Sequence, residues 1–384
     1  MAAYPIQQIW KESFQDFLNT GIPLSKEQLK ASFAILNCKT GALGYSVSQC
    51  QNCGHQVTYP HSCRNRNCPN CQAVKKELWV DQRGTEVMDA PYFHVVFTLP
   101  HELNPLLYEN QKLLYNLLHR CTAETLLELS ADKKYLGALP GIIQILHTWN
   151  QELNYHVHMH CIISGGGITP DHQLRFSKQS FFIPVKVLRN KFRGKFLAQL
   201  HTLFTKGILS LPQSLQDPIA WYAFKDALYQ KDWCPFIKQT FNGFGNAIDY
   251  LGRYTHKIAI SNSRILDISD RSVAFSARGL HPDDPKRTIT LSHLEFIRRF
   301  LLHVLPKGFQ KIRYFGFLSN RFKSKNLDLI FKLQGKLRFR GKFQDLSLPQ
   351  LIHTLWKKDI SVCPCCRQPS LRLLTPAELE VLLC

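Results

Sequence analysis

Residues 155–167 have the sequence Tyr155-His-Val-His-Met-His-Cys-Ile-Ile-Ser164-Gly-Gly-Gly167. His156, His158 and His160 alternate with apolar side chains, and this period of two predicts a β-strand with all three imidazoles on one face. Imidazoles on a rigid strand can hold a divalent ion and leave coordination positions open for a phosphate oxygen. The stretch therefore predicts a strand from Tyr155 to Ser164 that carries a metal site.

A second strand is expected just before this one, at residues 141–149, with a turn at 150–154. Strands joined by so short a turn form an antiparallel hairpin. In the simplest register His147 faces His156, which makes His147 the expected third metal ligand. Gln144 takes that place if the register slips by one residue. His156 either binds the ion itself or orients the site through a hydrogen bond.

The remaining pattern predicts an α+β fold, in which an antiparallel sheet is flanked by helices. A small helical and metal-binding module precedes it. Three consecutive domains are expected: residues 1–90, the sheet domain at 91–335, and a C-terminal appendage at 336–384. Further strands are predicted at residues 91–100, 257–263, 265–269, 272–276 and 311–318, and helices at 102–130, 186–209, 243–255 and 292–304.

A cysteine motif near the N-terminus has the spacing of a zinc site. Cys50-x2-Cys53 and Cys68-x2-Cys71 are two knuckles fourteen residues apart, and together they supply the four thiolates that tetrahedral zinc requires. Such a site is structural, because it leaves no open position for a substrate. Cys63, His55 and His61 lie nearby as spare or replacement ligands. Near the C-terminus, Cys363, Cys365 and Cys366 resemble half of another knuckle, which only the terminal Cys384 follows.

Composition points to a polyanionic partner. Lys and Arg number 48 against 28 acidic residues, a net charge of +20, and the sequence pI is near 9.5. An imbalance of this size favours nucleic acid, and Arg64 and Arg66 among the cysteines are candidate contacts. The 45% hydrophobic content excludes a disordered chain, and no apolar run is long enough for a membrane span. The N-terminus lacks signal-peptide order, so we expect a cytoplasmic protein with reduced cysteines.

Two tyrosines lie four residues apart in Asp249-Tyr-Leu-Gly-Arg-Tyr-Thr-His256. In a helix Tyr250 and Tyr254 share one face. Arg253 and Lys257 add positive charge, which favours ionisation of a phenol and stabilises a phosphate in transfer. Tyrosine can break a phosphodiester and keep its energy in a phosphotyrosine ester, so two tyrosines permit two such linkages in succession.

Three motifs together resemble the two-tyrosine HUH transposases of the insertion sequence 91 family. They are Phe97-Thr-Leu-Pro100, the His158-Met-His160 pair with its preceding Leu146-His-Thr-Trp149, and Tyr250-Leu-Gly-Arg-Tyr254 continued to Arg264. The cysteine module resembles the zinc-binding domain of that family, and the match covers most of residues 30–335 in the same order.

The resemblance implies a single-strand DNA endonuclease and ligase that moves its element by a rolling-circle-like route in a prokaryotic cell, bound to the nucleoid. His158 and His160 would bind Mg²⁺ or Mn²⁺, which polarises the scissile phosphate. Tyr250 and Tyr254 would attack that phosphate at the transposon ends and target, each leaving a 5′-phosphotyrosine and a free 3′-OH. Arg253, Lys257 and Arg264 are candidate DNA contacts. The sequence holds no Gly-x4-Gly-Lys-Ser/Thr loop, so strand separation falls to a host helicase or the replication machinery.

Three other readings remain open. A rolling-circle replication initiator or a relaxase would use the same histidine and tyrosine chemistry in a different biological role. A non-catalytic, zinc-dependent DNA-binding protein would account for the charge and the cysteines, but it leaves the histidine strand and the tyrosines without a role. A metallohydrolase of small substrates would give no role to the charge. Covalent capture of DNA by a tyrosine separates the first reading and the transposase from the other two.

Overall fold

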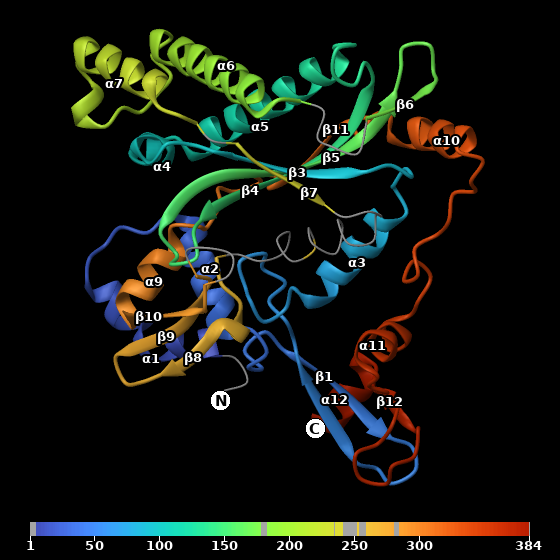
Figure 1. Cartoon of the computed structure of the whole chain (residues 1–384). Coiled ribbons are helices and arrows are strands. Elements are labelled where there is room, and N and C mark those ends of the chain that lie inside the picture. Colours follow the sequence, from blue (N-terminus) through green and yellow to red (C-terminus); the bar gives the residue numbers. More distant parts are fainter. Residues whose placement is uncertain are drawn as a thin grey trace. The chain divides into compact units, whose positions relative to one another are not determined.

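The computed structural model describes residues 5–177, 183–233, 235–240, 252, 259–279 and 284–383. Tyr250 and Tyr254, and with them Arg253 and Lys257, lie outside the described residues. The chain divides into two compact units, each built from separate stretches of sequence. We call residues 82–255 and 305–339 the sheet unit, and residues 1–81, 256–304 and 340–384 the cysteine unit (Figure 1).

The sheet unit contains a six-stranded antiparallel sheet. Its strand order is β11-β4-β5-β3-β7, and β6 pairs with β5. The strands are β3 (Tyr92–Thr98), β4 (Leu139–Trp149), β5 (Tyr155–Ile168), β6 (Leu174–Phe176), β7 (Phe236–Thr240) and β11 (Ile312–Gly316). The predicted hairpin of β4 and β5 is confirmed at the centre of this sheet, and the strand predicted at residues 311–318 is present as β11, which pairs with β4.

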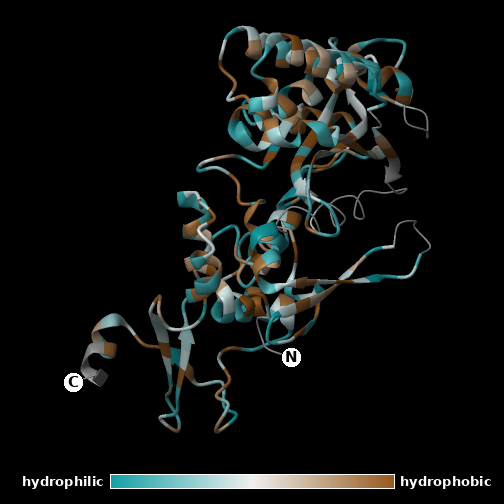
Figure 2. Cartoon of the chain, turned by 90° about the vertical axis from the view of Figure 1, so that its left-hand side faces the viewer, coloured by the Kyte–Doolittle hydropathy of each residue, from teal (hydrophilic) through white to brown (hydrophobic). Residues whose placement is uncertain are grey.

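Helices cover one face of this sheet. They are η1 (His101–Leu103), α4 (Asn104–Glu109), α5 (Gln111–Ala131), α6 (Val185–Thr205), η2 (Gln213–Leu215) and α7 (Pro218–Gln230), while α10 (Lys323–Leu333) follows β11. Figure 1 shows α5, α6 and α7 over the same side of the sheet. Both hydrophobic and hydrophilic residues occur along the helices (Figure 2), and apolar residues of α5 and α6, such as Leu118 and Phe196, belong to the core of the sheet unit. The predicted α+β class, an antiparallel sheet flanked by helices, is confirmed.

The core of the sheet unit shows which way each residue of β5 points. Val157, Met159, Cys161 and Ile163 all belong to the buried cluster that includes α5 and α6. Because side chains alternate along a strand, the even-numbered residues of β5 lie on the opposite face. The three histidines of β5 therefore share the face of the sheet opposite α5 and α6.

The glycines after the histidines extend this strand. β5 continues to Ile168, past Ser164 where the sequence suggested its end. A Cβ atom on Gly167 would lie 2.5 Å from the carbonyl oxygen of Leu139 on the neighbouring strand. Only a residue without a side chain permits this approach of the two backbones.

The cysteine unit combines helices with two small antiparallel sheets, ordered β12-β1-β2 and β10-β9-β8. The helices are α1 (Pro5–Asn19), α2 (Lys26–Asn37), α9 (His293–Leu301), α11 (Leu348–Trp356) and α12 (Pro376–Leu383), and the strands are β1 (Tyr45–Cys50), β2 (Gln56–Pro60), β8 (Ile265–Ile268), β9 (Ser272–Ala277), β10 (Arg287–Ser292) and β12 (Leu371–Leu373). Helix α3 (Ala73–Gly84) runs from the cysteine unit into the sheet unit. Trp10 of α1 packs edge-on against Phe296 and Phe300 of α9, and these aromatic contacts join sequence-distant helices.

One predicted strand is wrong in its described part. Residues 259–263 do not form a strand, and a short 3-10 helix, η3 (Asn262–Arg264), begins there instead. Ala259 has φ +48°, and this left-handed backbone conformation interrupts an extended chain. The division into domains 1–90, 91–335 and 336–384 stays a prediction, because the two compact units of the structure do not tell which segments fold independently. Among the described helices, none has the length and apolar character that crossing a membrane demands.

Candidate metal centre and cysteine clusters

The register of the central hairpin sets the position of the candidate metal ligands. His147 of β4 pairs with His158 of β5, whereas the sequence suggested that it would face His156. Trp149 pairs with Tyr155, so the turn is centred on Glu152 and would place His147 opposite Val157; the irregularity between His147 and Trp149 shifts the pairing by one further residue, to His158. Such a bulge adds a residue on one strand and moves every pair beyond it.

Three of the predicted side chains meet on the face of the sheet opposite α5 and α6. One potential ligand atom from each of His147, His158 and His160 lies within 4.8 Å of the others. The ring centroids are 4.3 Å apart for His147 and His160, 4.9 Å for His158 and His160, and 5.3 Å for His147 and His158. This is the spacing of three imidazoles that could converge on one ion.

The alternative third ligand points the other way. Gln144 lies among the side chains that face the helices, where its side-chain amide lies 2.8 Å from Nδ1 of His119 on α5. Gln144 therefore belongs to the core of the sheet unit, and the geometry favours His147.

Hydrogen bonds orient two of the imidazoles. Nδ1 of His158 lies 2.9 Å from the carbonyl oxygen of His156, to which it donates as Nδ1–H. Nδ1 of His160 lies 2.8 Å from Nε2 of His94 on β3, and the two rings stack with an interplanar angle of 4°. Because Nδ1 is engaged in both rings, Nε2 remains as the ligand atom. Outer partners of this kind fix the tautomer of metal-binding histidines.

Burial favours the neutral form of His158 and His160. Removal from water, together with the charge of the neighbouring His156, lowers the pKa of His158 to about 3. Burial likewise holds the pKa of His160 well below its ordinary value. A metal ligand must offer a lone pair, so a neutral histidine at pH 7 fits that role. The donor set, the spacing and the charge state all fit a divalent ion.

An aromatic ring and a lysine lie beside the histidines. Trp149 stacks on His147 with ring centroids 4.4 Å apart, and Nζ of Lys311 lies 4.8 Å from the centroid of the Trp149 ring. The charge of Lys311 also contributes to the lowered pKa of His160. A flat ring and a cation at this place could contact a base and a phosphate.

The cysteines form two clusters where the sequence suggested one. Cys68 and Cys71 lie with Cys38 and Cys63, whereas Cys50 and Cys53 lie with Cys363 and Cys366. The predicted grouping of Cys50, Cys53, Cys68 and Cys71 around one zinc is therefore wrong. The cause is that β1 and β2 form a hairpin, which carries the first knuckle away from the second and toward β12.

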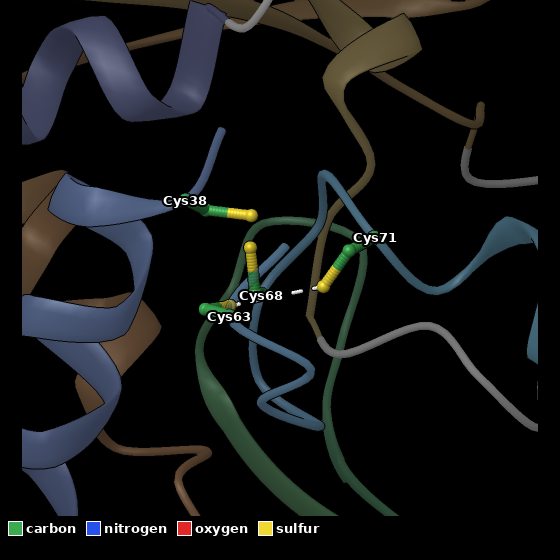
Figure 3. Close-up of side chains that lie close together, drawn as sticks. All are labelled: Cys38, Cys63, Cys68 and Cys71. Carbon is green, nitrogen blue, oxygen red and sulfur yellow. Dashed lines mark hydrogen bonds between the residues drawn. The ribbon is translucent and has the colours of Figure 1, made fainter. Parts of the chain in front are cut away.

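The first cluster has the geometry of a zinc site (Figure 3). Its four ligand atoms lie within 4.8 Å of one another, and Sγ of Cys63 is 3.7 Å from Sγ of Cys71. Four sulfurs at about 2.3 Å from a central ion in a tetrahedron are about 3.8 Å apart. The sequence pattern did not predict Cys38 as a ligand, because this residue lies alone at the end of α2, far from any paired cysteine. Cys63, named as a spare ligand, takes part, but His55 and His61 belong to neither cluster.

The described candidate DNA contacts differ in their surroundings. Arg64 and Arg66 are exposed in the loop that carries the first cluster. Arg264 is half-buried, donates from Nε to the carbonyl oxygen of Ser276 at 2.7 Å and lies over the ring of Phe275. Its contacts hold the sheet of β8, β9 and β10 together, so they account for this arginine without DNA.

Comparison with known proteins identifies the chain. Residues 141–326 match a family model described as "Putative transposase", and residues 9–99 match one described as "Transposase zinc-binding domain". The relative "Putative transposase y4qJ" of Sinorhizobium fredii (strain NBRC 101917 / NGR234) is 40% identical over 360 residues, which is 90% of this chain and 88% of that protein.

A second relative names the kind of element. The transposase for insertion sequence element IS801 of Pseudomonas savastanoi pv. phaseolicola is 30% identical over 308 residues, 78% of this chain and 72% of that protein. The chain belongs to the insertion sequence 91 family of transposases. A solved structure of the conjugative relaxase TrwC with oriT DNA covers 60% of this chain and 94% of its own at 11% identity. Its TM-score of 0.26 is too low to support any conclusion.

Proposed function

We propose that this transposase cleaves and rejoins single-stranded DNA through 5′-phosphotyrosine intermediates, in a metal-dependent reaction at the ends and target of its element. The observation that carries the proposal is the histidine cluster of His147, His158 and His160 on the face of the sheet opposite α5 and α6. A non-catalytic DNA-binding protein has no use for three imidazoles whose potential ligand atoms converge on one point.

The bound ion is proposed to be Mg²⁺ or Mn²⁺, which supplies positive charge to polarise the scissile phosphate. The chain's own residues prepare that place. His156 and His94 hold the rings of His158 and His160 in one orientation, and the sheet fixes all three ligands on rigid strands. Lys311 adds a cation next to Trp149, where a phosphate and a base could lie.

Tyr250 and Tyr254 are the proposed nucleophiles, and their support is the sequence and the family. In each step the phenol loses its proton and its oxygen forms a bond to phosphorus. The bond from phosphorus to the 3′ oxygen breaks, and that oxygen gains a proton to leave a free 3′-OH. A 3′-OH that returns reverses the step and rejoins a strand, which is why two tyrosines serve a transfer reaction. Along the chain the tyrosines follow β7, which pairs with β3, and β3 pairs with the histidine strand β5.

The cluster of Cys38, Cys63, Cys68 and Cys71 is proposed to hold a structural zinc. All four residues lie within the match to the transposase zinc-binding domain. The loop is short of large apolar residues, so a metal would supply the stability that a core cannot. Arg64 and Arg66 on the same loop are the proposed DNA contacts of this module. Strand separation is assigned to a host helicase or replication protein.

The test is cleavage of labelled single-stranded DNA from an element end, with added Mn²⁺ or Mg²⁺, by the full chain. His158→Ala and His160→Ala should each abolish cleavage and leave DNA binding intact. The matched control is His119→Gln. His119 is a buried histidine of α5, on the other side of the same sheet, and this variant should cleave normally. Equal cleavage by His158→Ala and the wild type would contradict the metal centre. Salt-sensitive DNA binding without any cleavage by the wild type would favour the non-catalytic DNA-binding protein.

A further inference from the structure

The second cysteine cluster joins the two ends of the chain. Cys50 is the last residue of β1 and Cys53 follows that strand, whereas Cys363 and Cys366 precede β12. Sγ of Cys50 lies 3.6 Å from Sγ of Cys366, and Sγ of Cys53 lies 3.7 Å from Sγ of Cys363. One ligand atom from each of the four lies within 4.8 Å of the others, so the four thiols surround one point.

These distances fit a tetrahedral metal site, and they are too long for a disulfide bond between the sulfurs. Sulfurs in a zinc tetrathiolate are about 3.8 Å apart, as in the first cluster, whereas a disulfide brings them to about 2.0 Å. Each pair has the C-x2-C spacing of a zinc knuckle, and the backbone N–H of Cys53 lies 3.4 Å from Sγ of Cys50, as expected when an amide donates to a thiolate. The hydroxyl of Ser370 lies 3.0 Å from the same sulfur.

We propose that Cys50, Cys53, Cys363 and Cys366 bind a second structural zinc ion, which fastens the C-terminal segment of the chain to its N-terminal hairpin. The match to the zinc-binding domain ends at residue 99, so it does not include the second pair of ligands. The complete module therefore needs residues from both ends of the protein.

The strands explain why a metal is needed at this place. β12 adds a third strand to β1 and β2, with Ser48 opposite Leu373 and Cys50 opposite Leu371. The backbone N–H of Gln51 donates to the carbonyl oxygen of Ser370 at 2.9 Å. Yet β2 is almost entirely exposed, and Leu373 of β12 is 59% exposed. Because these strands bury so little apolar surface, without a metal their hydrogen bonds would have to hold together segments more than 300 residues apart in the sequence. Closing so long a loop also costs entropy.

The chain contains its own control for the experiment. Cys365 lies between two of the proposed ligands, but it is exposed and belongs to neither cluster. In the full-length wild-type protein, purified under reducing conditions, brief alkylation with iodoacetamide should modify Cys365 and spare Cys363 and Cys366. Fragment-ion mass spectrometry of the peptide that contains all three distinguishes them. Addition of a strong zinc chelator should then expose Cys363 and Cys366 to alkylation together with Cys50 and Cys53.

Metal content gives a second, independent readout. Cys363→Ser combined with Cys366→Ser should lose one equivalent of zinc per chain relative to the wild type, and Cys365→Ser should lose none. Alkylation of Cys363 and Cys366 as fast as Cys365 in the wild type would overturn the proposal, even if the double variant failed to fold. Disulfides between Cys50 and Cys366 or Cys53 and Cys363, or iron in place of zinc, would also overturn it. Because alkylation is read at each residue, the result does not depend on whether the first cluster or the histidine site binds metal.

Discussion

The hydrogen bond between His94 and His160 should control how tightly the histidine site binds its ion. Both side chains are buried, and Nε2 of His94 lies 2.8 Å from Nδ1 of His160. His94→Leu removes the acceptor and leaves the Nδ1–H of His160 without this partner, at a cost of about 1–3 kcal/mol for a buried group. The ring can recover that energy only by turning away from the orientation in which Nε2 points to the ion. We expect the dissociation constant for Mn²⁺ to rise about 10- to 100-fold, which corresponds to about 1.4–2.7 kcal/mol.

The assay is calorimetric titration of the full chain with Mn²⁺. His94→Gln serves as the matched variant, because its amide oxygen can reach the position of Nε2 and accept the same hydrogen bond. It should bind Mn²⁺ within about threefold of the wild type if the bond, rather than the ring, matters. Unchanged affinity in a folded His94→Leu variant would refute the reasoning, and so would equal losses in the two variants.

Three further predictions concern charge and backbone. Burial and the nearby Arg313 lower the pKa of His119 to about 3, whereas the unfolded chain protonates it near 6.5. Its contribution to the free energy of unfolding is therefore present above pH 6.5 and is lost as pH falls toward 3, by about 1.4 kcal/mol per pH unit. In urea unfolding, the free energy of unfolding of His119→Gln should therefore fall less steeply between pH 6.5 and 4 than that of the wild type. Lys311→Met should weaken binding of single-stranded DNA and reduce its salt slope by about one, and an unchanged slope would exclude a phosphate contact. Gly316 has φ +64°, and a Cβ there would meet the carbonyl oxygen of Pro140. Gly316→Ala should therefore destabilise the protein by about 1–3 kcal/mol of backbone strain, with the clash in addition, and this loss should appear as a lower melting temperature. Gly308→Ala, at φ +71° with open space, isolates the strain and should cost less.

The central hairpin was predictable because its signal is local. Alternation from Tyr155 to Ser164 is a property of the strand itself, and the short turn at 150–154 forces an antiparallel partner. The exact register was not predictable in the same way. The register depends on where the turn is centred and on the irregularity between His147 and Trp149, and the pattern of residue types records neither.

The ligand sets show the same limit for long-range contacts. His158 and His160 were identified from sequence because their neighbours define one face of a strand. The cysteine grouping failed because sequence proximity favoured two knuckles in one loop, whereas the fold pairs Cys50 and Cys53 with cysteines more than 300 residues away. A signal was nevertheless present, since Cys363-x2-Cys366 repeats the spacing of the other knuckles. A lone cysteine such as Cys38 carries no such signal, because only the packing at the end of α2 brings it to the cluster.

Covalent capture of DNA tests the proposed chemistry most directly. The full chain is incubated with Mn²⁺ and single-stranded DNA from an element end, labelled on the 3′ side of the cleavage site, and the products are separated under denaturing conditions. We predict a labelled protein–DNA adduct that Tyr250→Phe combined with Tyr254→Phe abolishes, while DNA binding stays nearly unchanged because each ring loses only a hydroxyl. An adduct that survives in the double variant, or cleavage without any adduct in the wild type, would contradict the tyrosine mechanism.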